Sequence, residues 1–417
     1  MVITKGGVFM RKPHYAWFIC LGGALSLFTV MGLGVNIFSI YQPEIIAFNN
    51  FTNAQGSWIT TTRSLFILGT LLIVNQLCAR LGLRLVMTLG MALVGLSCFC
   101  FGTSTTFPMY CLSAALTGIG YCMGGMVPLS LIIANWFDSR RGLALGIGAA
   151  GSGVSTIFAP AIITRLIRNH GLKTAFFCEG SFILFIAAMG WLLLRTCPAD
   201  KGLFPYRVEG DLPAAQPAHT GTGHGRLPIV LLLLAAFLLG GPLGPAFSHL
   251  TVLYTTEGFD SMAVAGLISY MGFALCVSKI VCGQMYDRLG GRLSNTFVLG
   301  AYLVGHLLCC LAFTQSLPLA YVAITVFSFG ISVLAVSPAV WARDLASPAD
   351  YAKTVRAITT SYTFGMLVMG PIPGILADKF GSYIPAYLFF ALCQLVLTLI
   401  IQGIYFKLAL GGRPVKT

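Results

Sequence analysis

The sequence has 417 residues, of which 57% are hydrophobic and only 9% are charged, and its mean hydropathy is +0.87. Soluble domains carry about 25% charged residues, so this composition excludes a soluble globular protein and predicts an integral membrane protein. The net charge is +13, and we expect the excess basic residues to lie in cytoplasmic loops beside anionic lipid. A nucleic-acid partner is therefore not expected.

Thirteen cysteines are scattered through the apolar runs. Their spacing matches neither a zinc site nor a disulfide framework. We interpret them as small buried hydrophobic residues and expect neither a metal nor a cofactor.

Apolar runs long enough to cross a membrane follow one another along the chain, since a spanning helix needs about 20 residues. The first run has no small-residue cleavage site, so it is expected to be a retained helix and not a signal peptide. Hydropathy and turn residues predict twelve helices, at 14–41, 56–79, 85–103, 107–134, 142–164, 174–196, 227–253, 262–286, 293–313, 317–341, 357–378 and 382–407.

An even number of helices places both termini on one side of the membrane. Most of the 25 Lys and Arg residues then fall on the side of the termini, which the positive-inside rule identifies as the cytoplasm. We therefore expect a multi-pass protein of the cell's inner (plasma) membrane, monomeric, with both termini cytoplasmic.

The two halves of the sequence repeat each other. Arg80-x-Gly82-x-Arg84 follows the second predicted helix, and a similar run follows the eighth. The repeat predicts an N-terminal six-helix bundle at 1–196, a polar cytoplasmic linker at 197–226 and a C-terminal six-helix bundle at 227–417. Parallel repeats around a central site are a transporter architecture.

The second copy of this loop is the strongest motif, Gly283-x-x-x-Asp287-Arg288-x-Gly290-x-Arg292. Gly283 would allow close helix approach, Asp287 could pair with an arginine or cap a helix end, and Gly290 would make the tight turn. The motif resembles the loop signature of the major facilitator superfamily. The resemblance implies an all-α membrane protein with 12 transmembrane helices in two pseudo-symmetric six-helix bundles.

In that family the motif acts as a conformational gate on the cytoplasmic side. The first copy keeps Arg80 and Arg84 but reads Asn75 and Ala79 where the second copy has its leading glycine and aspartate. We therefore expect the inner gate to depend mainly on the second copy. A related run, Gly374-x-x-x-Asp378-Lys379-x-Gly381, is expected on the outer face.

A further run narrows the resemblance: Trp136-Phe137-x-x-Arg140-Arg141-Gly142, which leads into a glycine-rich helix. It is similar to the junction of the fourth and fifth helices in the monocarboxylate transporters and the oxalate/formate antiporters. The opening typical of animal monocarboxylate carriers is missing. Within the glycine-rich helix, 146–151 fits G-x-G-x-x-G, but no strand precedes it, so dinucleotide binding is not expected.

Lys279 lies in an apolar run with no acidic residue before Asp287. A cation in hydrocarbon costs roughly 2.5–3.5 kcal/mol, so it should face a cavity and meet a partner there. Its position matches the place where the resembling organic-anion families carry a cationic substrate-binding residue. We expect it to bind an anionic substrate; the alternative is a lysine that extends to the inner interface or lies neutral and buried.

Other groups could complete the site. Arg63, in the second helix, is expected in an outer vestibule or gate more than in the central site, because it lies on the order of 15 Å from Lys279 along the membrane normal. Tyr121, Tyr362 and Ser361 could hydrogen-bond a carboxylate, although buried tyrosines commonly bond a backbone carbonyl.

Two further groups titrate. His249 is the group nearest neutrality on a cavity-lining helix and could couple protons. Glu179, on a peripheral helix, is interpreted as structural.

The function predicted from sequence is secondary active transport of small organic anions, mono- or dicarboxylates, by alternating access, with anion exchange or proton symport as the mode. The alternative is a facilitator-type exporter of drugs or other neutral or cationic solutes, which would need an acid in the central cavity. An enzyme is not expected, because paired carboxylates, metalloprotease, nucleophile-elbow and P-loop motifs are all missing from the sequence.

Overall fold

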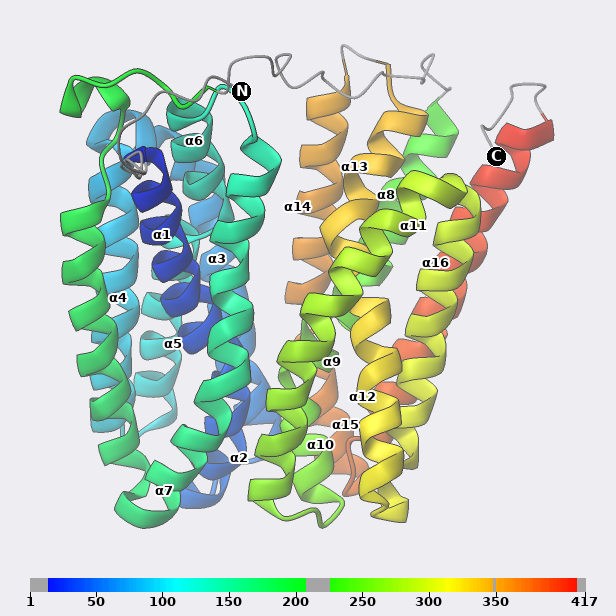
Figure 1. Cartoon of the computed structure of the whole chain (residues 1–417). Helices are drawn as coiled ribbons and strands as arrows, with labels where there is room; N and C mark the ends of the chain where they lie inside the picture. Colours follow the sequence, from blue (N-terminus) through cyan, green and yellow to red (C-terminus); the bar gives the residue numbers. More distant parts are fainter. Residues whose placement is uncertain (1–13, 208–225, 348–349, 411–417) are drawn as a thin grey trace, which may run out of the picture.

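The structure is a computed structural model that describes residues 14–207, 226–347 and 350–410. Its helices form two groups, α1–α7 and α8–α16, which stand side by side (Figure 1). Their bounds are α1 Ala16–Leu27, η1 Phe28–Asn36, α2 Phe38–Asn49, α3 Asn53–Leu81, α4 Leu83–Thr103, α5 Phe107–Gly124, α6 Met126–Trp136, α7 Arg141–Leu193, η2 Pro198–Lys201, α8 Arg226–Leu243, α9 Pro245–Ser248, α10 Leu250–Thr256, α11 Ser261–Cys309, η3 Cys310–Thr314, α12 Leu317–Ile331, α13 Val333–Leu345, α14 Tyr351–Met369, α15 Ile372–Phe380 and α16 Ile384–Leu410.

Each predicted span has a counterpart, although several elements are broken or joined. α7 and α11 each contain two predicted helices that run on through a glycine, Gly171 in α7 and Gly290 in α11. The first, fourth, seventh, tenth and eleventh spans are instead divided into shorter helices. Within the described residues, nine helices are long and apolar enough to cross a membrane. The all-helical membrane fold predicted from hydropathy is confirmed.

Proline and glycine lie at two of these breaks. α8 contains Pro242 and ends one residue later, and α14 gives way to α15 at Gly370 and Pro371. Proline removes a backbone donor and clashes with the preceding turn, which interrupts the helix. At Gly240 a side chain would meet the backbone carbonyl of Tyr362, so the missing side chain allows α8 and α14 to touch.

The first span is irregular for another reason: residues Phe28–Asn36 form a π-helix between α1 and α2. Such widened turns are rare and frequent at functional sites. Here the segment packs against α7, and the Ser155 side chain of α7 occupies the place that a Cβ on Gly32 would take. Asn36, at the end of this segment, donates from its side chain to the Thr156 hydroxyl of α7 at 3.0 Å.

We define the termini end as the end of the molecule where α1 begins and α16 finishes, and the far end as the opposite one. The two groups are spread apart at the termini end and come together at the far end, where α2, α10 and α15 lie (Figure 1). Between described residues, each side-chain hydrogen bond from one group to the other lies in the far half. The described hydrogen bonds between the two groups are therefore confined to the far end.

The turn glycines give a direct test of this fold. Gly171 has φ +82° and ψ 166°, and no atom lies within 4 Å of the place that a Cβ would take, so Gly171→Ala would suffer backbone strain alone. We expect a loss of about 1–3 kcal/mol in stability, because that backbone region is nearly restricted to glycine. Thermal unfolding of the detergent-purified protein measures the change.

Gly69→Ala is the matched control. Gly69 also has open space around it, but it lies inside α3. Alanine there is expected to gain about 0.5–1 kcal/mol from helix propensity. Equal effects of the two substitutions would contradict the assigned turn at Gly171.

Candidate functional site

Arg63 is a buried cation without a counter-ion among the described residues. Its side chain is only 6% exposed, and its guanidinium carbon lies 5.3 Å from the centre of the Phe38 ring on α2. It makes no hydrogen bond or ion pair with another described residue, and its nitrogens are not fully enclosed. A buried arginine normally satisfies its donors with a carboxylate or carbonyl groups. Arg63 therefore presents unused donors to accessible space.

Among the described residues, the groups that interact with this guanidinium are aromatic and include no acid. Arg63 is close enough to Tyr121 and to His249 to interact with them electrostatically, and Tyr121 is likewise close to Tyr362 of the second bundle. The Tyr121 hydroxyl makes no hydrogen bond to a described residue, so the carbonyl bond expected of a buried tyrosine is not formed. Arg63, Tyr121 and Tyr362 thus gather from α3, α5 and α14 around one region.

The depth of Arg63 can be followed along α3, and its role in an outer vestibule or gate stays a prediction. α3 begins at the far end. Two of its side chains contact the second bundle there: Ser57 bonds His249, and Thr61 lies against Gly370. These contacts separate Arg63 from the far end. At 1.5 Å per residue Arg63 lies about 15 Å along α3, near the middle of a hydrocarbon core of about 30 Å.

Lys279 lies on a different part of the interface. On α11, Gly272 packs against Thr156 of α7, and Cys276 lies against Gly153 of the same helix. Lys279 follows on this face and is exposed, with no hydrogen bond or ion pair to a described residue. One turn later no atom lies within 4 Å of the place that a Cβ on Gly283 would take. Lys279 therefore lies where the two bundles separate toward the termini end.

The opposite face of α11 does not carry this charge. Phe273 and Val277 line a shallow apolar groove against α12. Lys279 follows Val277 by two residues, which turns its side chain about 200° away. The lysine thus faces the side of the second bundle that meets α7, and not the groove.

Two other candidates are already engaged. Ser361 donates to the Leu233 carbonyl of α8 at 2.8 Å, which ties α14 to α8. His249 is fully buried: its Nδ1 lies 2.8 Å from the Pro245 carbonyl and its Nε2 lies 2.7 Å from Ser57 Oγ. The carbonyl can only accept, so Nδ1 donates and, in the neutral ring, Nε2 accepts from Ser57. In this conformation His249 joins the two bundles and has no ring nitrogen free for substrate.

Glu179 lies away from this region. It is buried in the first bundle with one carboxylate oxygen lacking a hydrogen bond to a described residue, and it interacts with Tyr41. It forms no ion pair with Arg63 within the described part of the chain. The structural interpretation of Glu179 stays a prediction.

One contact between the bundles is a helix cap at the far end. The Asp378 carboxylate of α15 accepts hydrogen bonds from the backbone nitrogens of Asn53 and Ala54, both at 2.8 Å. These are the first two residues of α3, where unsatisfied N–H groups and the helix dipole favour a negative charge. The Tyr383 hydroxyl also donates to the Asn53 side chain at 3.0 Å.

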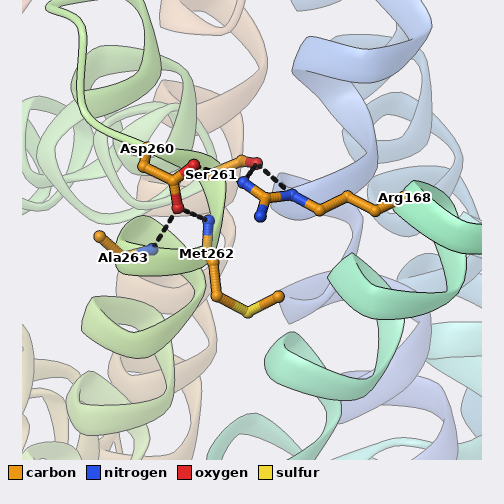
Figure 2. A network of polar contacts seen from close by, with 5 residues as sticks. All are labelled: Arg168, Asp260, Ser261, Met262 and Ala263. Carbon is orange, nitrogen blue, oxygen red and sulfur yellow. Dashed lines mark hydrogen bonds and ion pairs between the residues drawn. The ribbon is translucent and has the colours of Figure 1, made fainter.

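A second contact closes the same end on the other side of the interface (Figure 2). Arg168 of α7 pairs with Asp260 and also donates to the Ser261 hydroxyl at 2.8 Å. Asp260 in turn caps α11 through the backbone nitrogens of Met262 and Ala263. The Arg168 guanidinium, and then the Met262 N–H, hold the pKa of the Asp260 carboxyl below its usual value.

The residues of the predicted inner gate lie where the two bundles are apart in this structure. Gly290 has φ +73° and makes the turn between the two halves of α11, as predicted. The close approach expected at Gly283 is absent among the described residues, because the bundles are apart there. Arg288 is exposed, and Arg292 lies over the Phe406 ring of its own bundle at 5.8 Å. The side chain of Asp287 lies outside the described part of the chain.

In the first copy of the motif, Arg84 also contacts a residue of its own bundle. Arg84 lies 3.8 Å from the Trp191 ring centre and donates twice to the Trp191 carbonyl, at 2.8 and 3.0 Å. Arg80 is exposed. A gating role for these arginines stays a prediction.

The sequence analysis did not identify two features of this region, the role of Asn36 and the bond between Ser57 and His249. Asn36 is a polar residue in an apolar run beside Gly32 and Gly34, a signal that could have marked the π-helix. The partnership of Ser57 with His249 left no sequence signal, because it joins residues of different bundles.

Comparisons with known proteins agree with this architecture. The family model described as Major Facilitator Superfamily matches residues 23–358. The chain is 23% identical to the aspyridones efflux protein apdF of Emericella nidulans, over 90% of this chain and 74% of that protein. It is also 23% identical to monocarboxylate transporter 12 of Homo sapiens, over 90% of this chain and 77% of the relative. Among solved structures, the nucleoside transporter NupG aligns with a TM-score of 0.72 at 13% identity, covering 94% of this chain and 99% of that one.

The cap on α3 predicts that Asp378 holds the far end closed. Asp378→Asn removes the charge that faces the helix N-terminus, which is worth about 1 kcal/mol, or roughly a fivefold change in the balance of closed and open states. We expect faster amide hydrogen exchange at 53–57, measured by mass spectrometry. Lys379→Gln, which removes the neighbouring charge without touching α3, serves as control. Unchanged exchange in Asp378→Asn would show that the cap does not hold this end.

Proposed function

The chain belongs to the major facilitator superfamily, and we propose that its substrates are small organic anions, mono- or dicarboxylates, carried by alternating access. Family membership makes it a membrane transporter of small molecules and not an enzyme. The anionic substrate is our inference from the residues between the bundles.

One observation supports this inference above the others: two cations lie between the bundles without a counter-ion among the described residues. Arg63 is buried with donors that no described residue uses, and Lys279 pairs with no described residue where the bundles separate. An uncompensated charge in a low-dielectric environment is costly. A substrate carboxylate would supply the missing negative charge.

The conformation suggests how binding is converted into transport. The far end is closed by Asp378 and by Arg168 with Asp260, while the termini end is spread apart. If the termini are cytoplasmic, as the distribution of basic residues predicts, this is the inward-facing state. Closing the termini end around an unoccupied Lys279 would bury its charge. A bound anion neutralises it, and this lowers the free energy of the closed state relative to the open one.

The relatives support the same class without naming the substrate. One relative is described as a monocarboxylate transporter and another as an efflux protein. Export of a cationic drug is the second candidate, and it needs an acidic group facing the cavity. The two charged side chains on which this proposal rests, Arg63 and Lys279, are positive, which favours an anion in either direction of transport. Anion exchange and proton symport both fit this site.

The test is uptake of radiolabelled mono- and dicarboxylates into proteoliposomes, with and without a pH gradient. We expect Lys279→Gln to lower anion uptake by about 10- to 100-fold, since a hydrogen bond to a charged group contributes about 1.5–3 kcal/mol. Thermal unfolding should be unchanged, because Lys279 holds no described residue in place.

Lys173→Gln is the matched control, as this exposed lysine lies over Phe177 in the first bundle, away from the cavity. Its uptake should equal that of the unaltered protein. Normal uptake by Lys279→Gln would refute the role of Lys279, and lack of uptake of every carboxylate by the unaltered protein would refute the substrate class.

A further inference from the structure

We infer that Arg63 and Tyr121 form a second anion subsite, deeper in the protein than Lys279, that binds the carboxylate of a monocarboxylate substrate. This inference rests on the proposed function and refines it. It moves the deepest binding position from α11 of the second bundle to α3 and α5 of the first.

The first support is the state of the two side chains. Arg63 is only 6% exposed, yet its donors are neither bonded to a described residue nor fully enclosed. The Tyr121 hydroxyl also makes no hydrogen bond to a described residue, and it lies within electrostatic range of the Arg63 guanidinium. A planar guanidinium binds a carboxylate with two parallel hydrogen bonds, and a hydroxyl can donate a third.

The surroundings indicate one negative charge and an apolar remainder. Phe38 covers one face of the Arg63 guanidinium, and Tyr362 contributes from the second bundle. Glu179, the buried acid of the first bundle, forms no ion pair with Arg63 in the described structure. One cation with aromatic neighbours fits a carboxylate attached to a small apolar group.

The distance to Lys279 favours a monocarboxylate over a short dicarboxylate. From the far end, Arg63 lies about 15 Å along α3 and Lys279 about 27 Å along α11, so they are separated by about 12 Å along the membrane normal. The two helices also contact different partners, α3 facing α15 and α11 facing α7. A short dicarboxylate cannot bind both cations at once. Lys279 then receives the anion nearer the termini end, and Arg63 holds it below the closed far end.

The experiment measures equilibrium binding and transport separately. The full-length protein in detergent is titrated with lactate as the monocarboxylate, succinate as the dicarboxylate and choline as the cation control, and the rise in unfolding temperature gives the affinity. We expect a saturable rise with lactate, a weaker one with succinate and none with choline. Arg63→Gln should lose the lactate response by at least about tenfold in affinity.

Two conservative variants protect the test against misfolding. Arg63→Lys keeps the charge without the planar pair of donors and should retain a response that is about tenfold weaker. Tyr121→Phe removes one hydrogen-bond donor and should weaken lactate binding about three- to tenfold. Arg165→Gln, at an exposed arginine of α7, is the matched control and should bind lactate as the unaltered protein does.

The outcomes are distinct. If Arg63→Gln and Tyr121→Phe bind lactate normally while Lys279→Gln does not, the second subsite is refuted and the proposed function stands. A succinate response stronger than that to lactate would overturn the monocarboxylate assignment. If the unaltered protein neither binds nor transports any carboxylate, the proposed function itself fails.

Discussion

The arrangement of this protein depends on positive charge that has no counter-ion among the described residues, between two bundles whose described hydrogen bonds to each other lie at the far end. A guanidinium cannot lose its proton in proteins, so burial of Arg63 cannot be relieved by neutralisation of the side chain itself. The described residues around it offer aromatic rings and hydroxyl groups but no carboxylate. We propose that an anion entering from outside balances its charge, and this proposal connects the fold to the substrate.

At the closed far end of the molecule, by contrast, the charges are paired. There each charge of the two closing contacts has a partner: Asp378 meets the N-terminus of α3, and Arg168 meets Asp260 at the start of α11. These contacts are exposed and few, so opening them costs little compared with unfolding a bundle. A carrier that alternates between two states needs such a closure, strong enough to hold and weak enough to release.

His249 connects the closure to the interior. Its ring bonds Ser57 of the first bundle, one turn deeper than the Asp378 cap, and it lies within electrostatic range of Arg63. Separation of the bundles at the far end must break this bond. A negative charge bound at Arg63 would change the electrostatic environment of the same histidine. Anion binding at Arg63 and closure of the far end would therefore both act on His249.

The sequence alone determined the membrane class, the spans, the turn glycine at Gly290 and the family, because hydropathy and glycine spacing are local properties of the chain. It also singled out Lys279 and Arg63, since a charge in an apolar run is visible without a structure. Only the tertiary structure placed Arg63 beside Tyr121 below the far-end contacts, bonded Ser57 to His249 and brought Asp378 to the start of α3. Those relations join residues far apart in the sequence, and they arise from how helices and two separately packed bundles meet, which no local pattern encodes.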